Sequence, residues 1–90
     1  MARKRYSIKD RAAYHKSRMD DSTISVNKRS YSRQWMDGFT DKHPRENYLA
    51  VRDEIRFEKS RGPMSKDKKL LLYGYRNGLK AQLDRNAGKK

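Results

Sequence analysis

The chain has 90 residues, of which 33% are hydrophobic and 39% are charged, so it has room for one small domain with a modest core. Lysine and arginine number 24 against 11 aspartates and glutamates, and the resulting net charge of +13 favours polyanionic partners. The absence of cysteine excludes disulfide bonds, thiolate metal sites and a catalytic thiol.

The first predicted helix covers residues 8–20. Ser7 is a good N-cap, and Asp10 three residues later places negative charge in the first turn, where the helix dipole favours it. An apolar stripe recurs at helical spacing: Ile8, Ala12, His15 and Met19. The DDSTIS segment is expected to end this helix, because short polar and β-branched residues favour turns.

The second helix is predicted over residues 26–41, with Ser25 or Asn27 as its N-cap. Its apolar face consists of four residues: Tyr31, Trp35, Gly38 and Phe39.

The third helix is predicted to begin at Pro44, because the N–H that proline lacks is not needed in a first turn. Its apolar stripe has three members and two flanking residues: Tyr48, Val51 and Ile55, with Leu49 and Phe57 beside them. Gly62-Pro63 is expected to stop this helix.

The last segment fits either a helix or a β-hairpin. Asn77-Gly78 between alternating apolar residues is a typical hairpin signal. Residues 64–90 nevertheless contain no valine, isoleucine or threonine, and they are rich in residues that favour helix. Ser65 can cap such a helix, so a helix is predicted over residues 66–84, and the hairpin is the alternative.

Glycines suggest how the second and last helices pair. The segments WMDGF and YRNGL share the pattern aromatic, any residue, Asp or Asn, Gly, apolar. A glycine on a helix face lets a neighbouring backbone approach closely. Gly74 and Gly78 are therefore expected to pack against Trp35 and Gly38. Two basic residues of the last helix are expected to face outward: Arg76 and Lys80.

These elements predict an all-α fold, a small bundle of about four helices that forms a single domain over residues 1–90. The alternative is an α+β fold with a hairpin around Asn77-Gly78. Nine aromatic residues are more than a disordered chain usually holds. Basic, partly flexible tails are expected at residues 1–6 and 85–90. A partner, or a second copy of the chain in a homodimer, would complete the modest core.

The charge is unevenly distributed along the chain. Residues 1–18 carry seven basic residues and one acidic residue, whereas residues 37–58 carry four basic and six acidic residues. Folding can bring the two basic ends of the chain onto one face, and two separate solvated ends are the alternative.

A targeting or membrane segment is not predicted. The basic residues 1–5 precede no apolar stretch, so they do not form a signal peptide. No apolar run approaches the length of a transmembrane helix. The expectation is a cytoplasmic location in a host cell and no membrane partner.

Residue patterns for catalysis or cofactor binding are also absent from the sequence. A metal site needs three or four ligands, and the only histidines are His15 and His43; a pairing of His43 with Asp41 or Glu46 is the weak alternative. The serines fit caps and turns, and the glycines match no phosphate-binding loop. No catalytic residue, metal or cofactor is predicted, and the protein is expected not to be an enzyme.

Basic residues interleaved with aromatic residues point to a binding function. Arginine forks can grip phosphates, and tyrosines can stack on bases or pack on sugars. The candidate contact residues come from the N-terminal segment and the last helix: Arg3, Lys4, Arg5, Tyr6, Lys9, Arg11, Tyr14, Lys16, Arg18, Arg76 and Lys80. Tyr31 and Trp35 are expected in the core, whereas core packing and ligand contact are equally open for Tyr6 and Tyr14.

The chain resembles small basic accessory proteins of bacteriophages and other mobile elements in size and composition. The resemblance is carried by three blocks: MARKRYSIKDRAAYHKSRM, YSRQWMDGFTDK and YGYRNGLKAQL. That group includes inhibitors of host nucleic-acid enzymes, among them anti-CRISPR proteins. The resemblance implies a non-enzymatic inhibitor, and it transfers no functional residues.

Three functions follow as hypotheses. The first is an inhibitor that docks on a host nucleic-acid-handling protein or nucleoprotein, through nucleic acid or an acidic protein surface, and blocks it. The second is a direct DNA- or RNA-binding protein of architectural or regulatory type. The third is a small virion component. The sequence has no sequence-reading motif, so phosphate and shape are expected to dominate any nucleic-acid contact.

Overall fold

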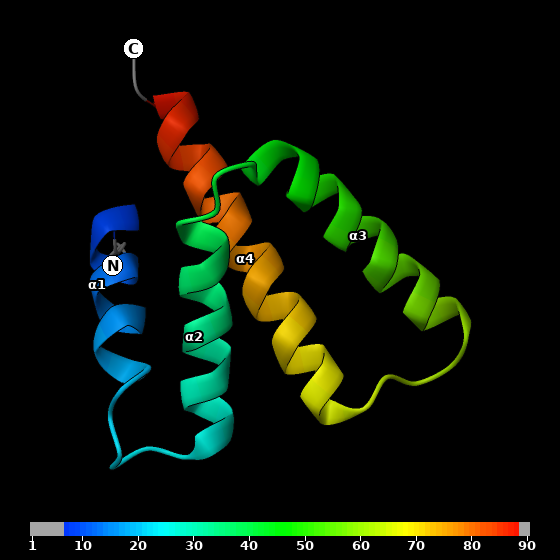
Figure 1. Cartoon of the computed structure of the whole chain (residues 1–90), viewed down its shortest axis with the longest axis horizontal. Coiled ribbons are helices and arrows are strands. Elements are labelled where there is room, and N and C mark those ends of the chain that lie inside the picture. The colour runs from blue at the N-terminus through cyan, green and yellow to red at the C-terminus, as the bar shows by residue number, and fades with distance from the viewer. Residues whose placement is uncertain (1–6, 89–90) are drawn as a thin grey trace, which may run out of the picture.

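The computed structural model describes residues 7–88, and this part of the chain forms four helices and no strand (Figure 1). In chain order the helices are α1 (Ile8–Arg18), α2 (Val26–Phe39), α3 (Pro44–Ser60) and α4 (Lys66–Gly88). The predicted all-α fold is confirmed. The hairpin alternative is wrong, because Asn77 and Gly78 lie in the middle of α4, in a segment without β-branched residues.

Serine side chains cap the start of three helices. Ser7 Oγ accepts the Asp10 N–H at 3.0 Å, and Asp10 Oδ2 accepts the Ser7 N–H at 3.4 Å, which completes a capping box at α1. Ser25 and Ser65 each accept the N–H three residues further along, at 3.3 and 3.2 Å. Ser25 is therefore the cap of α2, and Pro44 begins α3 as predicted.

Aspartate side chains end α1 and α2 two residues before the predicted positions. Asp21 Oδ1 accepts the backbone N–H of Thr23 at 2.9 Å, and Asp41 Oδ1 accepts that of His43 at 2.7 Å. An aspartate side chain that accepts the N–H two residues further along stabilises a turn and competes with continuation of the helix. The helices consequently end at Arg18 and Phe39 rather than at residues 20 and 41.

The last helix is longer than predicted. It continues to Gly88 instead of ending at residue 84, because its last turns still contact α2: the Arg85 guanidinium carbon lies 4.7 Å from the ring centroid of Phe39. Within the predicted C-terminal tail, residues 85–88 are thus helical. The predictions for residues 1–6 and 89–90 fall outside the described residues.

Glycines bring α2 and α4 into backbone contact, as predicted. A Cβ added to Gly78 would overlap the Trp35 carbonyl oxygen, and a Cβ added to Gly38 would overlap the Tyr75 carbonyl oxygen. A Cβ on Gly74 would lie 2.9 Å from the carbonyl oxygen of Tyr31. The two helix axes can approach this closely because these positions lack side chains.

The other two helices flank the α2–α4 pair on opposite sides (Figure 1). Helix α3 packs on α4 around one cluster of buried residues: Val51, Ile55, Met64 and Leu79. Helix α1 packs on α2 beside a second cluster: Trp35, Phe39 and Ala81. Trp35 is 3% exposed, which confirms its predicted place in the core.

Candidate nucleic-acid interface

A stack of aromatic rings fixes α1 on α2. The imidazole of His15 stacks on Trp35 with ring centroids 4.5 Å apart, and Trp35 stacks on Phe39 at 5.0 Å. His15 Nδ1 also lies 3.0 Å from Ser32 Oγ, and Ser32 is fully buried. Arg33 of α2 donates from Nη2 to the carbonyl of Met19, the C-cap of α1, at 3.4 Å, so a second contact holds the C-terminal end of α1.

Burial lowers the pKa of His15, and the nearby Arg11 guanidinium lowers it further. The imidazole is therefore neutral at pH 7. A neutral ring can stack on Trp35 and bond to Ser32 without placing a charge in the core. His15 thus has a structural role at the junction of α1 and α2.

Two hollows open between α1 and α4, with α2 as their floor. The first has a volume of about 390 Å³, and its lining includes Arg11, His15, Tyr31, Asn77, Lys80 and Asp84. The second has a volume of about 610 Å³, and its lining includes Tyr14, His15, Arg18, Lys28, Tyr31 and Lys66. His15 and Tyr31 line both hollows, so we treat the two as one surface, the basic groove.

Positive charge dominates the basic groove. Among the described residues that line it, one is acidic, Asp84, and five are basic: Arg11, Arg18, Lys28, Lys66 and Lys80. The basic residues come from three helices, so tertiary packing gathers them. Concave surfaces of one sign of charge focus the electrostatic field and raise the local concentration of counter-ions.

Arg18 and Tyr14 form the most distinctive pair in the groove. The Arg18 guanidinium carbon lies 4.7 Å from the Tyr14 ring centroid, and Tyr14 remains 51% exposed. Arg18 Nε is buried and has no hydrogen-bond partner within residues 7–88. The pair therefore offers an accessible aromatic surface with a positive charge held beside it.

A polar chain connects the groove floor to α4. Asn77 Nδ2 donates to the Tyr31 hydroxyl at 2.8 Å, and Arg76 Nη2 and Nε donate to Asn77 Oδ1 at 3.2 and 3.3 Å. The Arg76 guanidinium also lies 4.7 Å from the ring centroid of Tyr73. Arg76 is partly exposed, and these contacts hold its guanidinium against its own helix, whereas Lys80 is exposed.

The structure brings together some of the predicted contact residues. Four of them line the groove: Arg11, Tyr14, Arg18 and Lys80. Lys9 and Lys16 are exposed on α1 but do not line it. The predictions for Arg3, Lys4, Arg5 and Tyr6 fall outside the described residues.

Among the groove residues outside the predicted contact list, two are basic and one is a tyrosine. Lys28 and Lys66 lie in the first turns of α2 and α4, and the packing of three helices brings them near Tyr14. Tyr31 was expected in the core, but it is only partly buried and forms the groove floor. The sequence shows further lysines close to Lys66, at positions 68 and 69.

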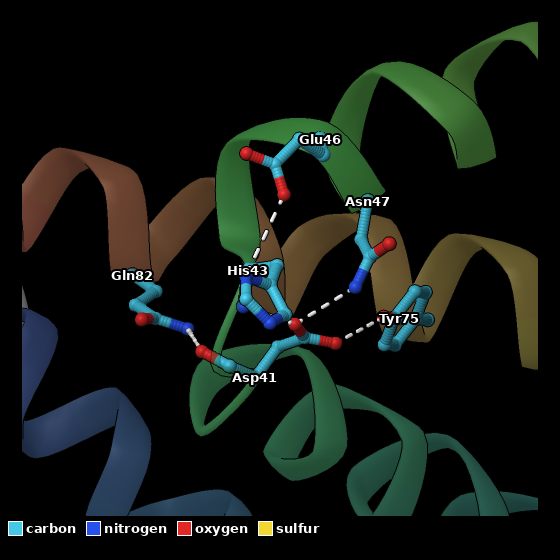
Figure 2. Close-up of polar contacts among 6 residues, drawn as sticks. All are labelled: Asp41, His43, Glu46, Asn47, Tyr75 and Gln82. Atoms are coloured by element: carbon cyan, nitrogen blue, oxygen red, sulfur yellow. Dashed lines mark hydrogen bonds and ion pairs between the residues drawn. The ribbon is translucent and has the colours of Figure 1, made fainter.

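A second polar cluster joins the α2–α3 loop to α4 (Figure 2). Asp41 Oδ1 accepts from His43 N at 2.7 Å and from Asn47 Nδ2 at 2.8 Å, while the Tyr75 hydroxyl donates to Asp41 Oδ2. Gln82 Nε2 donates to the Asp41 carbonyl at 3.0 Å. The cluster fixes the start of α3 relative to α4.

Neither Asp41 nor Tyr75 changes its protonation state near neutral pH. The hydrogen bond from Tyr75 is the main cause that lowers the pKa of Asp41. Burial, followed by the bond to Asp41, raises the pKa of Tyr75 to about 12. Asp41 stays ionised and Tyr75 stays protonated, so the pair has a structural role.

Metal and membrane sites are not found in the described part of the chain. Residues 7–88 contain no cluster of three or more His, Asp or Glu side chains that could hold a metal ion. Within the same range, none of the helices has the length and apolar character needed to cross a bilayer.

The chain was compared with known proteins at the levels of family, sequence and fold. No family model, no curated protein and no solved structure matches it. The geometry and charge of the basic groove therefore carry the functional argument.

Proposed function

We propose that this protein binds nucleic acid without catalysing a reaction, and that the basic groove contacts the phosphate backbone. The observation that carries the proposal is the convergence of five basic side chains from α1, α2 and α4 around one concave surface with a single acidic residue in its described lining. Nucleic acid is the polyanion with the charge density to match such a surface. This is the second of the three hypotheses from the sequence.

The kinds of side chain in the groove favour backbone contact over sequence reading. Arginine presents a planar fork that matches phosphate, and lysine acts as a mobile point charge. Contacts of this kind set position and affinity but carry no sequence information. Binding is therefore expected to be insensitive to sequence and strongly weakened by salt.

A second candidate function is that of an inhibitor that docks on a host nucleoprotein. The observation that favours it is a second exposed surface on α3, on the far side of the α2–α4 pair from α1 (Figure 1). Leu49 and Phe57 on this helix are 46% and 57% exposed, among charged residues of both signs. A protein with these two faces could hold nucleic acid at the groove and protein at α3.

Binding of short oligonucleotides tests the first function. The variant K28A/K66A/K80A removes three exposed charges from the groove, and R45A/R52A/R56A removes three exposed charges from α3. The groove variant is expected to lose affinity at least about tenfold at low salt and to lower the salt slope by about 2–3. The two variants have the same net charge, but only the α3 variant keeps the groove intact. The α3 variant is therefore expected to retain most of the affinity.

Two results would contradict the first function. One is that both variants lose affinity equally, since the effect would then come from net charge alone. The other is that the unmodified protein does not bind oligonucleotides at low salt. Capture of a protein from host lysate that survives nuclease treatment, and that requires Leu49 and Phe57, would then favour the second function.

A further inference from the structure

We infer that the wider hollow of the basic groove, the one beside Tyr14, holds an unstacked base of single-stranded nucleic acid. The inference rests on the proposed function and names the form of nucleic acid that the groove accepts. Tyr14 and Tyr31 provide aromatic surface, and Arg18, Lys28 and Lys66 provide positive charge within the same hollow. Proteins that bind single strands combine these two features, since every base has a face that can stack.

The size of the hollow suits a single nucleotide. Its volume of about 610 Å³ lies within the range of roughly 300–1,000 Å³ that is typical of small-molecule sites. A base in a duplex is stacked between its neighbours and is not available to enter such a hollow. A single strand can present its bases, because they can be splayed out at low cost.

The orientation of α1 also argues against a duplex as the preferred ligand. Proteins that read a duplex usually lay an exposed helix face into the major groove. In this protein Tyr14 and Arg18 lie in the hollow between α1 and α4. A duplex laid on the outer face of α1 would meet Lys9 and Lys16, which do not line the hollow, and would leave Tyr14 without a partner.

Polar and charged groups in the hollow match the chemistry of a nucleotide. The Arg18 guanidinium carbon lies 4.7 Å from the Tyr14 ring centroid, and Arg18 lines the hollow. The guanidinium fork suits the acceptor oxygens of a phosphate. Ser25 and Asn27, at the start of α2, line the same hollow, so the positive end of the α2 dipole adds to its attraction for phosphate.

The test compares single strands with a duplex at one ionic strength. The probes are fluorescein-labelled 12-nucleotide oligothymidylate and oligouridylate, and a 12-base-pair DNA duplex. Tyr14→Ala is expected to weaken binding of a single strand roughly five- to a hundredfold and to weaken duplex binding much less, since the Tyr14 ring also holds the Arg18 guanidinium. Tyr14→Phe, which keeps the ring, is expected to bind like the unmodified protein.

Phe57→Ala is the matched control, because Phe57 is an exposed aromatic residue on α3, outside the groove. It is expected to leave the affinity for single strands unchanged. A circular dichroism spectrum equal to that of the unmodified protein shows that Tyr14→Ala is folded. The two single strands show whether DNA or RNA is preferred, and tighter binding of either one than of the duplex supports the inference.

The inference can fail while the proposed function stands. If K28A/K66A/K80A weakens binding of all probes but Tyr14→Ala weakens none, the groove binds phosphate and no base enters the hollow. Duplex binding as tight as single-strand binding would overturn the inference in the same way. If neither K28A/K66A/K80A nor Tyr14→Ala changes any affinity, the proposed function fails as well.

Discussion

His15 joins α1 to the core while it remains neutral at pH 7. Its ring stacks on the ring of Trp35, with centroids 4.5 Å apart, and its Nδ1 lies 3.0 Å from Ser32 Oγ. Both partners are buried side chains of α2. A proton on this ring would place charge beside Arg11, which already lowers the pKa of His15. The free energy that holds α1 in place therefore depends on pH.

The pH dependence has a definite sign. Because the folded protein lowers the pKa of His15 below its usual value of about 6.5, the unfolded chain binds this proton more readily. The free energy of unfolding is expected to be fully retained above pH 6.5 and to fall as the pH drops through the folded pKa. Urea unfolding at several pH values between 7.5 and 5 measures this change.

A His15→Gln variant is the control for that measurement, because glutamine has no charge to gain in the same range. The variant is expected to lose less stability between pH 7.5 and 5 than the unmodified protein. Equal losses would show that His15 is not the group responsible. The lowered pKa of Asp41 does not interfere, because its contribution to stability is lost only below the ordinary aspartate pKa of about 4.

At the scale of elements, the fold depends on the crossing of α2 and α4. Gly38 and Gly78 meet backbone atoms of the opposite helix, and this contact sets the spacing of both core clusters. The Cβ of any other residue at position 78 would meet a carbonyl oxygen, which cannot move away by a change of rotamer. The crossing is thus the point where a small change in volume has the largest effect.

Gly78→Ala is expected to destabilise the protein. Alanine adds about 1 kcal/mol of helix propensity, but the overlap with the Trp35 carbonyl forces the helices apart. Overpacking of this kind costs roughly 1–3 kcal/mol, and occasionally more, so a net loss in the free energy of unfolding is expected from urea titration. Gly88→Ala is the control, because a Cβ there meets nothing within 4 Å. Equal stability of the two variants would contradict the role of the crossing.

Sequence reasoning predicted the features that depend on local chemistry. The caps at Ser7 and Ser65, Pro44 at the start of α3, and the pairing of Gly78 with Trp35 all follow from residue type and spacing. The extent of α4 was underestimated, because the contact between Arg85 and Phe39 spans 46 positions of the chain. Local propensity contains no information on such a contact.

The groove was only partly predictable for the same reason. Arg11, Tyr14 and Arg18 belong to one basic and aromatic segment, which the sequence displays directly. Lys28 and Lys66 join them only after α2 and α4 pack together. Arg76 looked like a further contact by spacing, but Tyr73 and Asn77 engage its guanidinium.

At the scale of the whole molecule, the bundle separates two kinds of surface. The N-terminal end of α1 and the C-terminal end of α4 lie at the same end of the molecule (Figure 1), and Arg11 and Lys80 line one hollow there. Basic residues from distant parts of the chain therefore share one face. Helix α3, which holds acidic and basic residues together, lies on the other side.

The central claim is that nucleic acid binds in the groove between α1 and α4, and a nuclear magnetic resonance titration tests it most directly. A ¹⁵N-labelled protein is titrated with a 12-nucleotide single strand at low salt, and backbone amide shifts are followed residue by residue. The largest shifts are expected around Tyr14, Arg18, Lys28 and Lys66, with little change along the exposed face of α3. Shifts centred on α3, or an unchanged spectrum, would contradict the account.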